Sequence, residues 1–569
     1  MRKIVFIAIL ITLILSFSIA QAAHKSAPPA ASVHLPAAAI AAFQKIDPEH
    51  IRAHVRFLSH DLLEGRGTGQ RGGDIAAEYI ATQFWLYGLK AAGDNGTFFQ
   101  KVPMVGITPA QETTFELAPN KGDAMQLKPL DQYVGYDQTG HASDDIDADI
   151  VYIGYGIEAP EYQWDDYKGT DVRGKVLLML VNEPSSDDPN FFKGRALTYY
   201  GRWTYKYEEA ARKGAVGVIL IHKADMASYP WEVVRNSNSG EKSFLKSDAP
   251  QLKAASWVQL DIARQLAQKS GMDLDKMMAD AQSRNFHPVQ LPAKLKAHMA
   301  SKIRPFTSNN VVAMLPGFES GAKNEAIMYT AHYDHLGIRP DMPGDNIYNG
   351  ARDNGTGCGI LLELARAYSQ GQAKPRRSVL FASVTAEEQG LLGSEYLGKH
   401  PPIPAANISL DLNFDDVPPL GSPQEVEVSG SERTTFYPTV EAMAKEFRLA
   451  IRPDSHPEAG HYYRSDHFSM ARVGVPAFSI NEGMKYKGHS TEWGLQQAEE
   501  FTNKHYHQPS DEYSPDMDFT GDAAIARFSF ALGWAAASQP KLIGWQKGDE
   551  FEKERIRSAG GERRDGGSE

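Results

Sequence analysis

The residues best suited to chemistry in this sequence are histidines and carboxylates, most of which directly follow short apolar segments. They are His332 and Asp334 after segment 326–331, Asp353 in the glycine-rich turn 349–357, Glu387 and Glu388 after segment 378–385, Asp411 after segment 408–410, and His507 in the motif Tyr506-His507-Gln508-Pro509. In an open α/β sheet, ligand-binding residues gather at the carboxyl ends of the strands. Unpaired carboxylates are costly to bury, so a cation is expected beside them. Imidazole and carboxylate both suit zinc, and two histidines with three carboxylates make a ligand set for two zinc ions.

The elements that must position these residues alternate between strands and helices. Strands are expected at 310–315, 326–331, 378–385, 408–414 and 475–480, and helices at 359–368, 439–447 and 523–537. Two amphipathic helices are also expected earlier in the chain, one from Asp47 and one from Asp74. This alternation predicts an α/β layered fold with a mostly parallel central sheet flanked by helices.

Residues 140–290 have their own set of strands and contain no cluster of metal-ligating residues. Short buried strands are expected at 149–156, 175–181 and 216–221, with a helix at 206–213. We interpret this block as a smaller, β-rich inserted domain between two parts of the metal-binding domain, residues 46–139 and 291–545. Residues 23–45, rich in Ala and Pro, are predicted to be a linker, and the charged, Gly-rich residues 546–569 a disordered tail.

The first 22 residues have the pattern of a secretory signal peptide. Arg2 and Lys3 precede an almost unbroken apolar run, and Ala20-Gln21-Ala22 supplies the small residues expected before a cleavage site. No later segment has the roughly 20 consecutive apolar residues of a membrane span. The sequence therefore predicts an exported protein, periplasmic or extracellular, with no membrane span after cleavage.

Composition excludes several classes of protein. The chain has 569 residues, 42% of them apolar, and a formal net charge of −12. An acidic chain has no general attraction to phosphate, which argues against a nucleic-acid partner. The single cysteine, Cys358, excludes an internal disulfide and a multi-cysteine zinc site.

The motifs named above resemble those of the co-catalytic zinc peptidases. This family includes secreted bacterial leucyl aminopeptidases, glutamate carboxypeptidase, glutaminyl cyclase and the transferrin receptor. The matching pieces are His332-Tyr333-Asp334, Asp353 in its turn, Glu387-Glu388, Asp411 in Ser409-Leu410-Asp411-Leu412, and Tyr506-His507-Gln508-Pro509; the segment 63–69 resembles the entry helix and turn. More loosely, Asp166-Tyr167-Lys168-Gly169 and its surroundings resemble the protease-associated domain that some members carry as an insertion.

The resemblance implies a role for each residue. His332 and Asp411 are expected to bind one zinc ion, Glu388 and His507 the other, and Asp353 to bridge both. Glu387 is expected to be the general base, and Asp334 to orient the ring of His332. Tyr506 matches a position where some members place an oxyanion-stabilising phenol; packing beside His507 is the alternative. Arg464 and Asp466 lie in a segment that resembles the family's substrate-side loop; a structural turn is the alternative. His335 is outside the family pattern and is expected to have a structural or ligand-supporting role.

Three functions are compatible with this resemblance. The first is a secreted zinc aminopeptidase that removes N-terminal residues from peptide substrates. The second is a carboxypeptidase of the glutamate carboxypeptidase type, for which Arg339, Arg352 and Arg464 are candidate carboxylate-binding residues. The third is a non-catalytic binding protein on the same scaffold, which the complete set of ligands disfavours. Side-chain specificity and oligomeric state are left open by the sequence.

Overall fold

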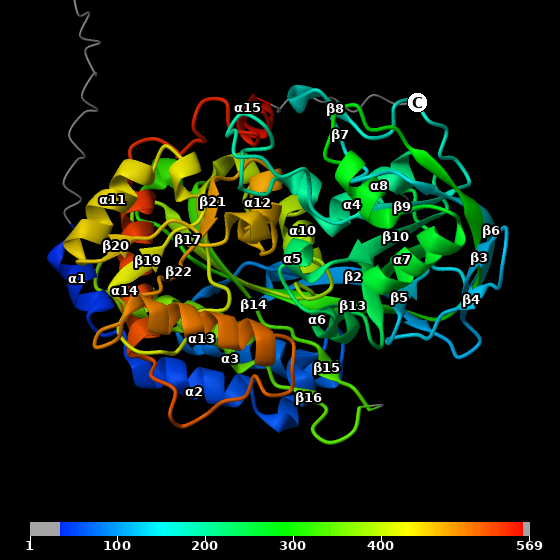
Figure 1. Ribbon diagram of the computed structural model, residues 1–569. Coiled ribbons are helices and arrows are strands. Elements are labelled where there is room, and N and C mark those ends of the chain that lie inside the picture. Colours follow the sequence, from blue (N-terminus) through cyan, green and yellow to red (C-terminus); the bar gives the residue numbers. More distant parts are fainter. Residues whose placement is uncertain (1–34, 248, 341, 561–569) are drawn as a thin grey trace, which may run out of the picture.

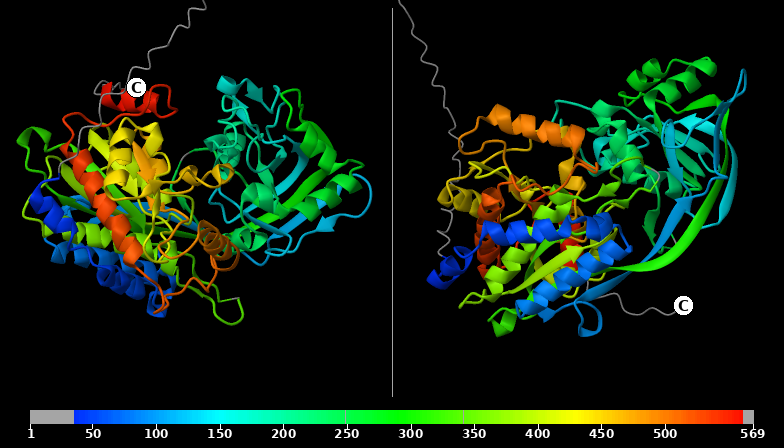
Figure 2. Two further views of the ribbon diagram at one scale, coloured as in Figure 1. Left: turned by 60° about the vertical axis from the view of Figure 1, so that its left-hand side comes forward. Right: turned by 90° about the horizontal axis from the view of Figure 1, so that it is seen from below.

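A strand of 27 residues, β13 (Val289–Leu315), joins the two halves of the molecule. The computed structural model describes residues 35–247, 249–340 and 342–560. Up to residue 300, β13 pairs with β3 (Thr114–Pro119) and β6 (Ser143–Tyr152); beyond it, β13 pairs with β2 (Phe99–Pro109) and β17 (Ser378–Val384). We call residues 114–300 the second region and the rest the first region. Figure 1 shows them side by side, and Figure 2 shows β13 curving from one to the other.

The sheet of the first region has a parallel centre. β21 (Ala477–Ser479), β18 (Ile408–Asn413), β14 (Ala326–His332) and β17 lie next to one another in that order and run parallel. β13 and then β2 extend the sheet in antiparallel pairing, and the short strand β1 (Lys90–Ala91) also pairs with β13. Each of these parallel strands is buried on both faces, which explains their nearly continuous apolar sequences.

Helices cover both faces of this sheet. On one face, Ile327 and Tyr329 of β14 share a core with four helices: α2 (Pro48–Leu58), α3 (Arg71–Leu86), α9 (Gly357–Ser369) and α14 (Thr520–Ser538). On the other face, Ala326 and Met328 pack with two shorter helices, α10 (Leu392–Lys399) and α12 (His467–Arg472). The alternation follows from the two-residue period of a strand. The remaining helices of the first region are α1 (Ala37–Phe43), α11 (Tyr437–Glu446), α13 (Thr491–Lys504) and α15 (Glu552–Gly560).

The second region has a sheet of its own, ordered β13, β6, β9, β10, β12, β5. The strands from β6 to β12 are parallel and β5 is antiparallel to its neighbour. The bounds of the strands not yet given are β9 (Val176–Leu180), β10 (Gly217–His222), β12 (Ala254–Gln259) and β5 (Tyr133–Tyr136). The short strand β4 (Met125–Gln126) pairs with β3. The helices are α4 (Trp203–Arg212), α5 (Ala224–Ala227), α6 (Trp231–Ser237), α7 (Leu260–Lys269) and α8 (Leu274–Asp280). One further strand of this region, β11 (Lys242–Leu245), leaves it and pairs with β2 of the first region.

Short two- and three-residue strands complete the fold. They are β7 (Glu158–Ala159), β8 (Trp164–Asp165), β15 (Gly337–Ile338), β16 (Ile347–Tyr348), β19 (Glu425–Glu427), β20 (Ala450–Ile451) and β22 (Asn481–Glu482).

Three expected boundaries differ from the structure. The second region begins near Thr114 rather than at residue 140, because β3 and β5 pair with its strands. The expected linker 23–45 contains helix α1, whose Ala39 and Ala42 are buried in the core. The expected tail contains α15, because Phe551 is buried and Arg555 donates hydrogen bonds to the carbonyls of Ala405, Ile408 and Ile543.

The predicted signal peptide, residues 1–22, lies outside the described residues. Among the helices that are described, none combines the length and the apolar character needed to cross a bilayer.

Candidate metal centre

The pairing of three neighbouring parallel strands brings the candidate residues to one edge of the sheet. His332, the last residue of β14, lies opposite Val384 of β17, so the Glu387-Glu388 pair follows just beyond it. On the other side of β14, Thr330 lies opposite Asn413 of β18. Continuing that register places residue 415 level with His332. The carboxyl ends of the strands therefore meet where the sequence predicts a ligand site.

The turn that carries Asp353 is fixed from behind by a buried carboxylate. Asp511 accepts hydrogen bonds from the backbone N–H groups of Arg352 and Asp353, each at 3.0 Å. The backbone carbonyl of Asp511 in turn accepts from the N–H of Ala351. Since Asp511 follows His507 closely in the chain, these bonds also set the position of the His507 segment relative to Asp353.

A buried arginine ties the same turn to the end of β14. Arg66, which is 0% exposed, donates hydrogen bonds to the backbone carbonyls of Asn349 and Gly350, just before the turn, and to that of Tyr333, beside His332. A guanidinium has five donors in a rigid fork, so one side chain can hold several carbonyls in a fixed arrangement. This explains why the glycine-rich segment 63–69 lies next to the site.

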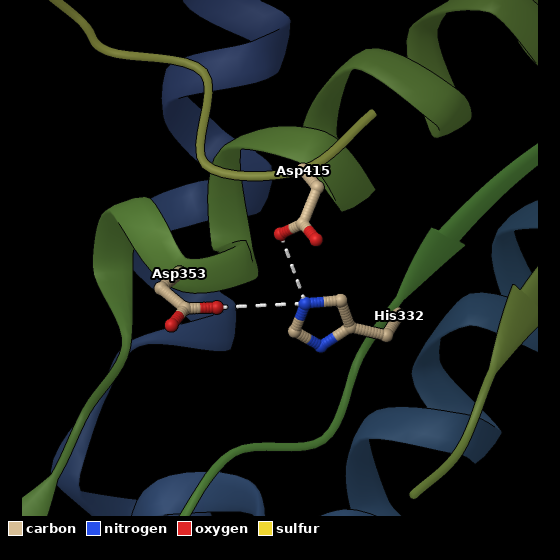
Figure 3. A group of neighbouring side chains, drawn as sticks. All are labelled: His332, Asp353 and Asp415. Carbon is tan, nitrogen blue, oxygen red and sulfur yellow. Dashed lines mark hydrogen bonds and ion pairs between the residues drawn. The ribbon is translucent and has the colours of Figure 1, made fainter. Parts of the chain in front are cut away.

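One group of potential ligands forms around His332. Its Nε2 lies 3.1 Å from Oδ1 of Asp415 and 3.4 Å from Oδ1 of Asp353 (Figure 3). Burial lowers the pKa of His332, but the neighbouring Asp415, Glu387 and Asp353 raise it more, and the net pKa lies well above its usual value. His332, Asp353 and Asp415 lie close enough together to hold one metal ion.

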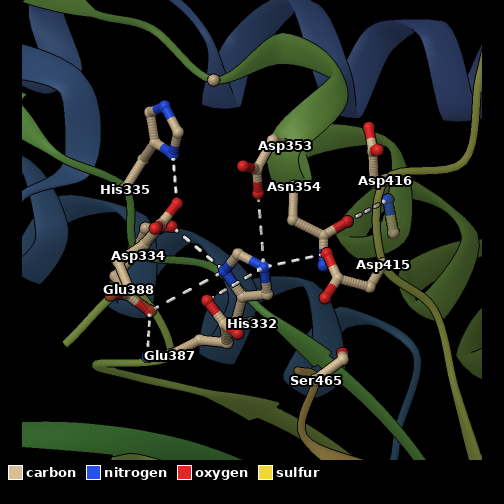
Figure 4. Close-up of polar contacts among 12 residues, drawn as sticks. His332, Asp334, His335, Asp353, Asn354, Glu387, Glu388, Asp415, Asp416 and Ser465 are labelled. Atoms are coloured by element: carbon tan, nitrogen blue, oxygen red, sulfur yellow. Dashed lines mark hydrogen bonds and ion pairs between the residues drawn. The ribbon is translucent and has the colours of Figure 1, made fainter. Parts of the chain in front are cut away.

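A second group forms around the other oxygen of Asp353. Nε2 of His507 lies 3.3 Å from Oδ2 of Asp353 and 3.1 Å from Oε2 of Glu388. The other Glu388 oxygen, Oε1, lies 2.6 Å from Nδ1 of His335. Burial raises the pKa of Glu388, but His507 and His335 lower it further, to well below its usual value. Asp353, Glu388 and His335 are also close enough together to hold a metal ion. Figure 4 shows His335 and Glu388 on one side of His332 and Asp415 on the other.

Glu387 contacts both His332 of the first group and the buried Asp334. Its Oε2 is 3.9 Å from Nε2 of His332, and its backbone N–H donates to Oδ1 of Asp334 at 3.0 Å. Burial raises the pKa of Glu387 well above its usual value. Asp334 is completely buried, accepts a second hydrogen bond from Thr68 Oγ1 at 2.9 Å, and has its pKa raised by burial to about 6. The nearest acceptor to Nδ1 of His332 is the backbone carbonyl of Asp334, at 3.2 Å, rather than its carboxylate, at 3.9 Å.

Parts of the chain are similar in sequence to known proteins. Residues 310–531 match the family described as peptidase family M28. The leupeptin-inactivating enzyme 1 of Streptomyces exfoliatus is 28% identical over 248 residues, which is 42% of this chain and 51% of that protein. A probable zinc metalloprotease of Pyrenophora teres f. teres (strain 0-1) is 35% identical over 125 residues, 21% of this chain and 24% of that protein.

Residues 310–531 form a peptidase family M28 domain.

The curated relatives match only part of their own length, about half for the Streptomyces enzyme and about a quarter for the fungal one. Among solved structures, the aminopeptidase from Aneurinibacillus sp. strain AM-1 is similar in fold, with a TM-score of 0.53, 19% identity, and coverage of 89% of this chain and 97% of that one. The M28 match spans all the residues that the strands bring together at the sheet edge, from His332 to His507.

The structure corrects one predicted ligand of the M28 domain. Asp411 lies within β18 opposite Met328, four residues before His332, and its carboxyl group accepts hydrogen bonds from Thr330 Oγ1 at 3.1 and 3.3 Å. Burial raises the pKa of Asp411 well above its usual value. Four residues of strand correspond to about 13 Å, so Asp411 is not beside the histidine, and Asp415 takes its place. The predicted strand 408–414 contained the signal, because Asp411 falls within it and Asp415 directly after it.

The remaining predicted residues lie around the M28 site with different contacts. The ring of Tyr506 stacks on that of His507, with centroids 3.9 Å apart. Arg464 donates through Nη2 to the backbone carbonyl of Ala227, in the second region, at 3.1 Å. Asp466 is completely buried, and burial raises its pKa to about 7. Two residues with no role predicted from the sequence also contact the site: Thr68 donates to Asp334, and Asp415 lies next to His332. Thr68 belongs to segment 63–69, but a threonine there does not by itself indicate that it bonds to Asp334.

Proposed function

We propose that this chain is a zinc-dependent exopeptidase, and specifically an aminopeptidase that uses two zinc ions to hydrolyse the N-terminal peptide bond of its substrates. The observation that carries the proposal is the position of Asp353, whose two carboxylate oxygens face two different histidines, His332 and His507. A single carboxylate shared in this way is the arrangement expected of a bridge between two metal ions. The fungal relatives described as probable zinc metalloproteases and the aminopeptidase with the same fold support zinc and this activity.

The donor set fits two zinc ions without a thiolate. His332 and Asp415 would hold one ion, Glu388 and His507 the other, and Asp353 both; imidazole and carboxylate suit zinc. His335 would hydrogen-bond to Glu388 Oε1 instead of binding the metal ion. His507, whose Nε2 faces Glu388 Oε2 and Asp353 Oδ2, would be the histidine ligand. When bound, a zinc pair lowers the pKa of a water molecule toward about 7 and polarises the carbonyl that is attacked.

The protein's own contribution to the reaction is proton transfer and orientation. Glu387 has one backbone hydrogen bond to Asp334 and its carboxylate faces the first metal group. Its burial stabilises the protonated form, so it can take a proton from the attacking water and give it to the leaving amine. Arg66 and Asp511, which hold the Asp353 turn, keep the metal-binding oxygens at fixed positions.

A carboxypeptidase is the second candidate, and Arg464 is the observation that favours it. Of the three arginines considered, Arg352 pairs with Asp416 at 2.6 Å and Arg339 donates to Ser239 Oγ and the carbonyl of Asn236. Among the described residues, Arg464 donates one hydrogen bond, to the neutral backbone carbonyl of Ala227, and its buried Nε has no hydrogen-bond partner. The carboxylate of a substrate would accept a hydrogen bond from this Nε.

The two activities are distinguished by blocking one end of the substrate. Purified protein is incubated with peptides that have a free or an acetylated N-terminus and a free or an amidated C-terminus, with and without zinc after chelation. We expect cleavage that needs a free N-terminus and zinc but tolerates C-terminal amidation. Cleavage that needs a free C-terminus would favour the carboxypeptidase. Full activity after metal analysis has verified the removal of zinc would exclude both.

Two further proposals concern the rest of the chain. We propose that the protein is exported, on the signal-peptide pattern of residues 1–22; N-terminal sequencing of protein from the periplasm or medium is expected to begin at Ala23. We also propose that the second region is a protease-associated domain, on the sequence Asp166-Tyr167-Lys168-Gly169 and its position between the two parts of the first region.

A further inference from the structure

A short segment of the second region, residues 236–243, contacts the two loops that carry His507 and Glu388 of the second metal group. It links the end of α6 to β11, the strand that pairs with β2 of the first region. At one end, Asn236 and Ser237 contact the segment of His507. At the other, Lys242 Nζ donates to the backbone carbonyl of Glu388 at 3.3 Å, and the N–H of Ser243 donates to Gln389 Oε1 at 3.0 Å. We call residues 236–243 the strap.

Ser237 contacts the ring nitrogen of His507 that faces away from the carboxylates. Its Oγ lies 2.8 Å from Nδ1 of His507, while Nε2 faces Glu388 and Asp353. A histidine can ligate a metal through Nε2 only when that nitrogen carries a lone pair, so the ring proton must then be on Nδ1. An acceptor at Nδ1 selects this tautomer and fixes the rotation of the ring.

Asn236 holds the backbone of the same histidine. Its Nδ2 donates to the carbonyl of His507 at 2.9 Å and to Gln508 Oε1 at 3.1 Å, and its side chain is almost completely buried. His507 has a φ of 55°, in the left-handed region that non-glycine residues rarely adopt. Such a conformation is strained for a residue with a side chain and persists only where the surroundings enforce it. The amide of Asn236 is one of the groups that do so.

The strap is itself held by the first region. Arg339, which follows β15, donates through Nη2 to the carbonyl of Asn236 at 3.2 Å and through Nε to Ser239 Oγ at 2.9 Å. Ser239 Oγ also donates to the carbonyl of Asn236 at 3.1 Å. These buried bonds and the β11–β2 pairing fix both ends of the strap, so Ser237 and His507 are held at a defined separation.

We propose that Ser237 is a positioning residue for the catalytic centre, so that the second region completes the metal site instead of only lying beside it. Ser237 accepts the Nδ1 proton of His507 and presents Nε2 to the metal. The inference rests on the proposed function in that it takes His507 as a zinc ligand. It adds that Ser237, which is 270 positions from His507 in sequence and in a different region, sets the affinity of His507 for zinc.

The test measures zinc binding rather than hydrolysis. Full-length apoprotein is titrated with zinc against a competing chelating dye, for the wild type and for Ser237→Ala, Ser237→Thr and Asn238→Ala. Asn238 is the matched control. It is at the end of the same helix, its side chain donates to the carbonyl of Val234 within α6, and it has no hydrogen bond to the His507 segment among the described residues. Removing a hydrogen-bond partner of a ligating histidine typically lowers metal affinity about 10–100-fold.

We expect Ser237→Ala to lower the affinity for one of two zinc ions by about 10–100-fold, Ser237→Thr to restore it, and Asn238→Ala to leave both unchanged. In the background His507→Gln, adding Ser237→Ala is expected to have no further effect on zinc affinity, because the serine acts through the histidine. Unchanged zinc affinity in Ser237→Ala, even with lower thermal stability, would overturn the positioning role. Failure of the wild-type protein to bind two zinc ions would instead contradict the proposed function.

Discussion

At the scale of single residues, the site depends on carboxylates with different tasks. Asp353 faces His332 and His507, whereas Glu388 faces His507 and His335. Glu387 points its carboxylate at His332, while its backbone N–H donates to Asp334. Glu387 and Glu388 are adjacent and chemically identical, so their surroundings alone separate them. The pKa values diverge accordingly: that of Glu387 is raised by burial, whereas that of Glu388 is lowered by two histidines that outweigh its burial. Such a divergence is the usual sign of an acid–base pair with separate roles.

Replacing each of the two glutamates by glutamine is expected to give different phenotypes. Glu387→Gln removes the base but no ligand, so the catalytic constant should fall by about 10²–10⁴ with both zinc ions retained. Glu388→Gln weakens a direct ligand, so one zinc ion should bind less tightly and activity should recover in part at high zinc. Peptide hydrolysis and metal content measured on the same samples check this. Loss of a metal in Glu387→Gln with full occupancy in Glu388→Gln would reverse the two roles.

Asp353→Asn is expected to weaken both zinc sites together. The amide keeps one oxygen acceptor, but its nitrogen cannot ligate, and the two present oxygens face different histidines. Zinc titration should show lower affinity for both ions, with unchanged far-UV circular dichroism. A loss confined to one ion would mean that Asp353 does not bridge.

At the scale of secondary-structure elements, strand register decides which aspartate joins the site. The sequence predicted β14, β17 and β18 nearly to the residue, and the edge of the sheet where their side chains meet. It did not predict that Asp415, just after β18, takes the place of Asp411 within the strand. The choice depends on pairing between residues 81 positions apart in sequence. Because β18 is buried on both faces, its apolar sequence does not by itself fix the register.

The pair Asp415→Asn and Asp411→Asn tests this register directly. Asp415→Asn should remove a ligand of the first zinc ion and lower its affinity strongly. Asp411→Asn should leave zinc binding unchanged, because Asp411 lies within β18 opposite Met328, away from His332, and the amide oxygen can still accept from Thr330. Zinc titration of both variants is the measurement. If Asp411→Asn lost a metal and Asp415→Asn kept both, Asp411 would be the ligand after all.

The boundaries that the sequence missed have a different cause. Helix α1 is built from Ala-rich sequence that also suits a linker, and only its packing against the core makes it helical. The strands at the start of the second region are short, and β3 and β5 become strands by pairing with β13 and β12 far along the chain. Local composition does not reveal a partner of this kind.

Helix α14 begins with a buried carboxylate that makes stability depend on pH. Asp522 is 0% exposed, neither of its oxygens has a hydrogen-bond partner among the described residues, and burial raises its pKa to about 8. A helix N-terminus favours a negative charge, but here burial has the larger effect. The unfolded-state pKa is about 3.9, so the folded state binds the proton more tightly and stability falls as pH rises from about 4 to about 8.

Asp522→Asn is therefore expected to be nearly neutral at about pH 4 and increasingly stabilising up to about pH 8. The amide cannot ionise, so it removes the pH-dependent loss of stability. Because the entropy of unfolding grows with chain length, each kcal/mol gained should raise the melting temperature of a chain of this size by about 1 °C. Thermal unfolding of both proteins at the two pH values checks this. A destabilisation of the same size at both pH values would show that the carboxyl group has a structural bond that the amide cannot replace.

At the scale of the whole molecule, β13 and the strap make the two regions one unit. β13 contributes to both sheets without interruption, and the strap joins the second region to the loops of Glu388 and His507. The metal site therefore lies where the two regions meet, although all the proposed ligands come from the first region. This arrangement predicts that zinc stabilises both regions together.

Zinc is expected to raise a single unfolding transition rather than one of two. A ligand that binds only the folded state stabilises it by about 2.7 kcal/mol at a free concentration of 100 Kd, and this stabilisation reaches every element that unfolds in the same step. Differential scanning calorimetry of the apoprotein and the zinc-loaded protein measures the transition, and the buried Trp257 of the second region and Trp534 of the first region provide local probes. Both probes should follow one transition that moves to higher temperature with zinc. Two transitions, with zinc shifting only the one that includes Trp534, would show that β13 and the strap do not couple the regions.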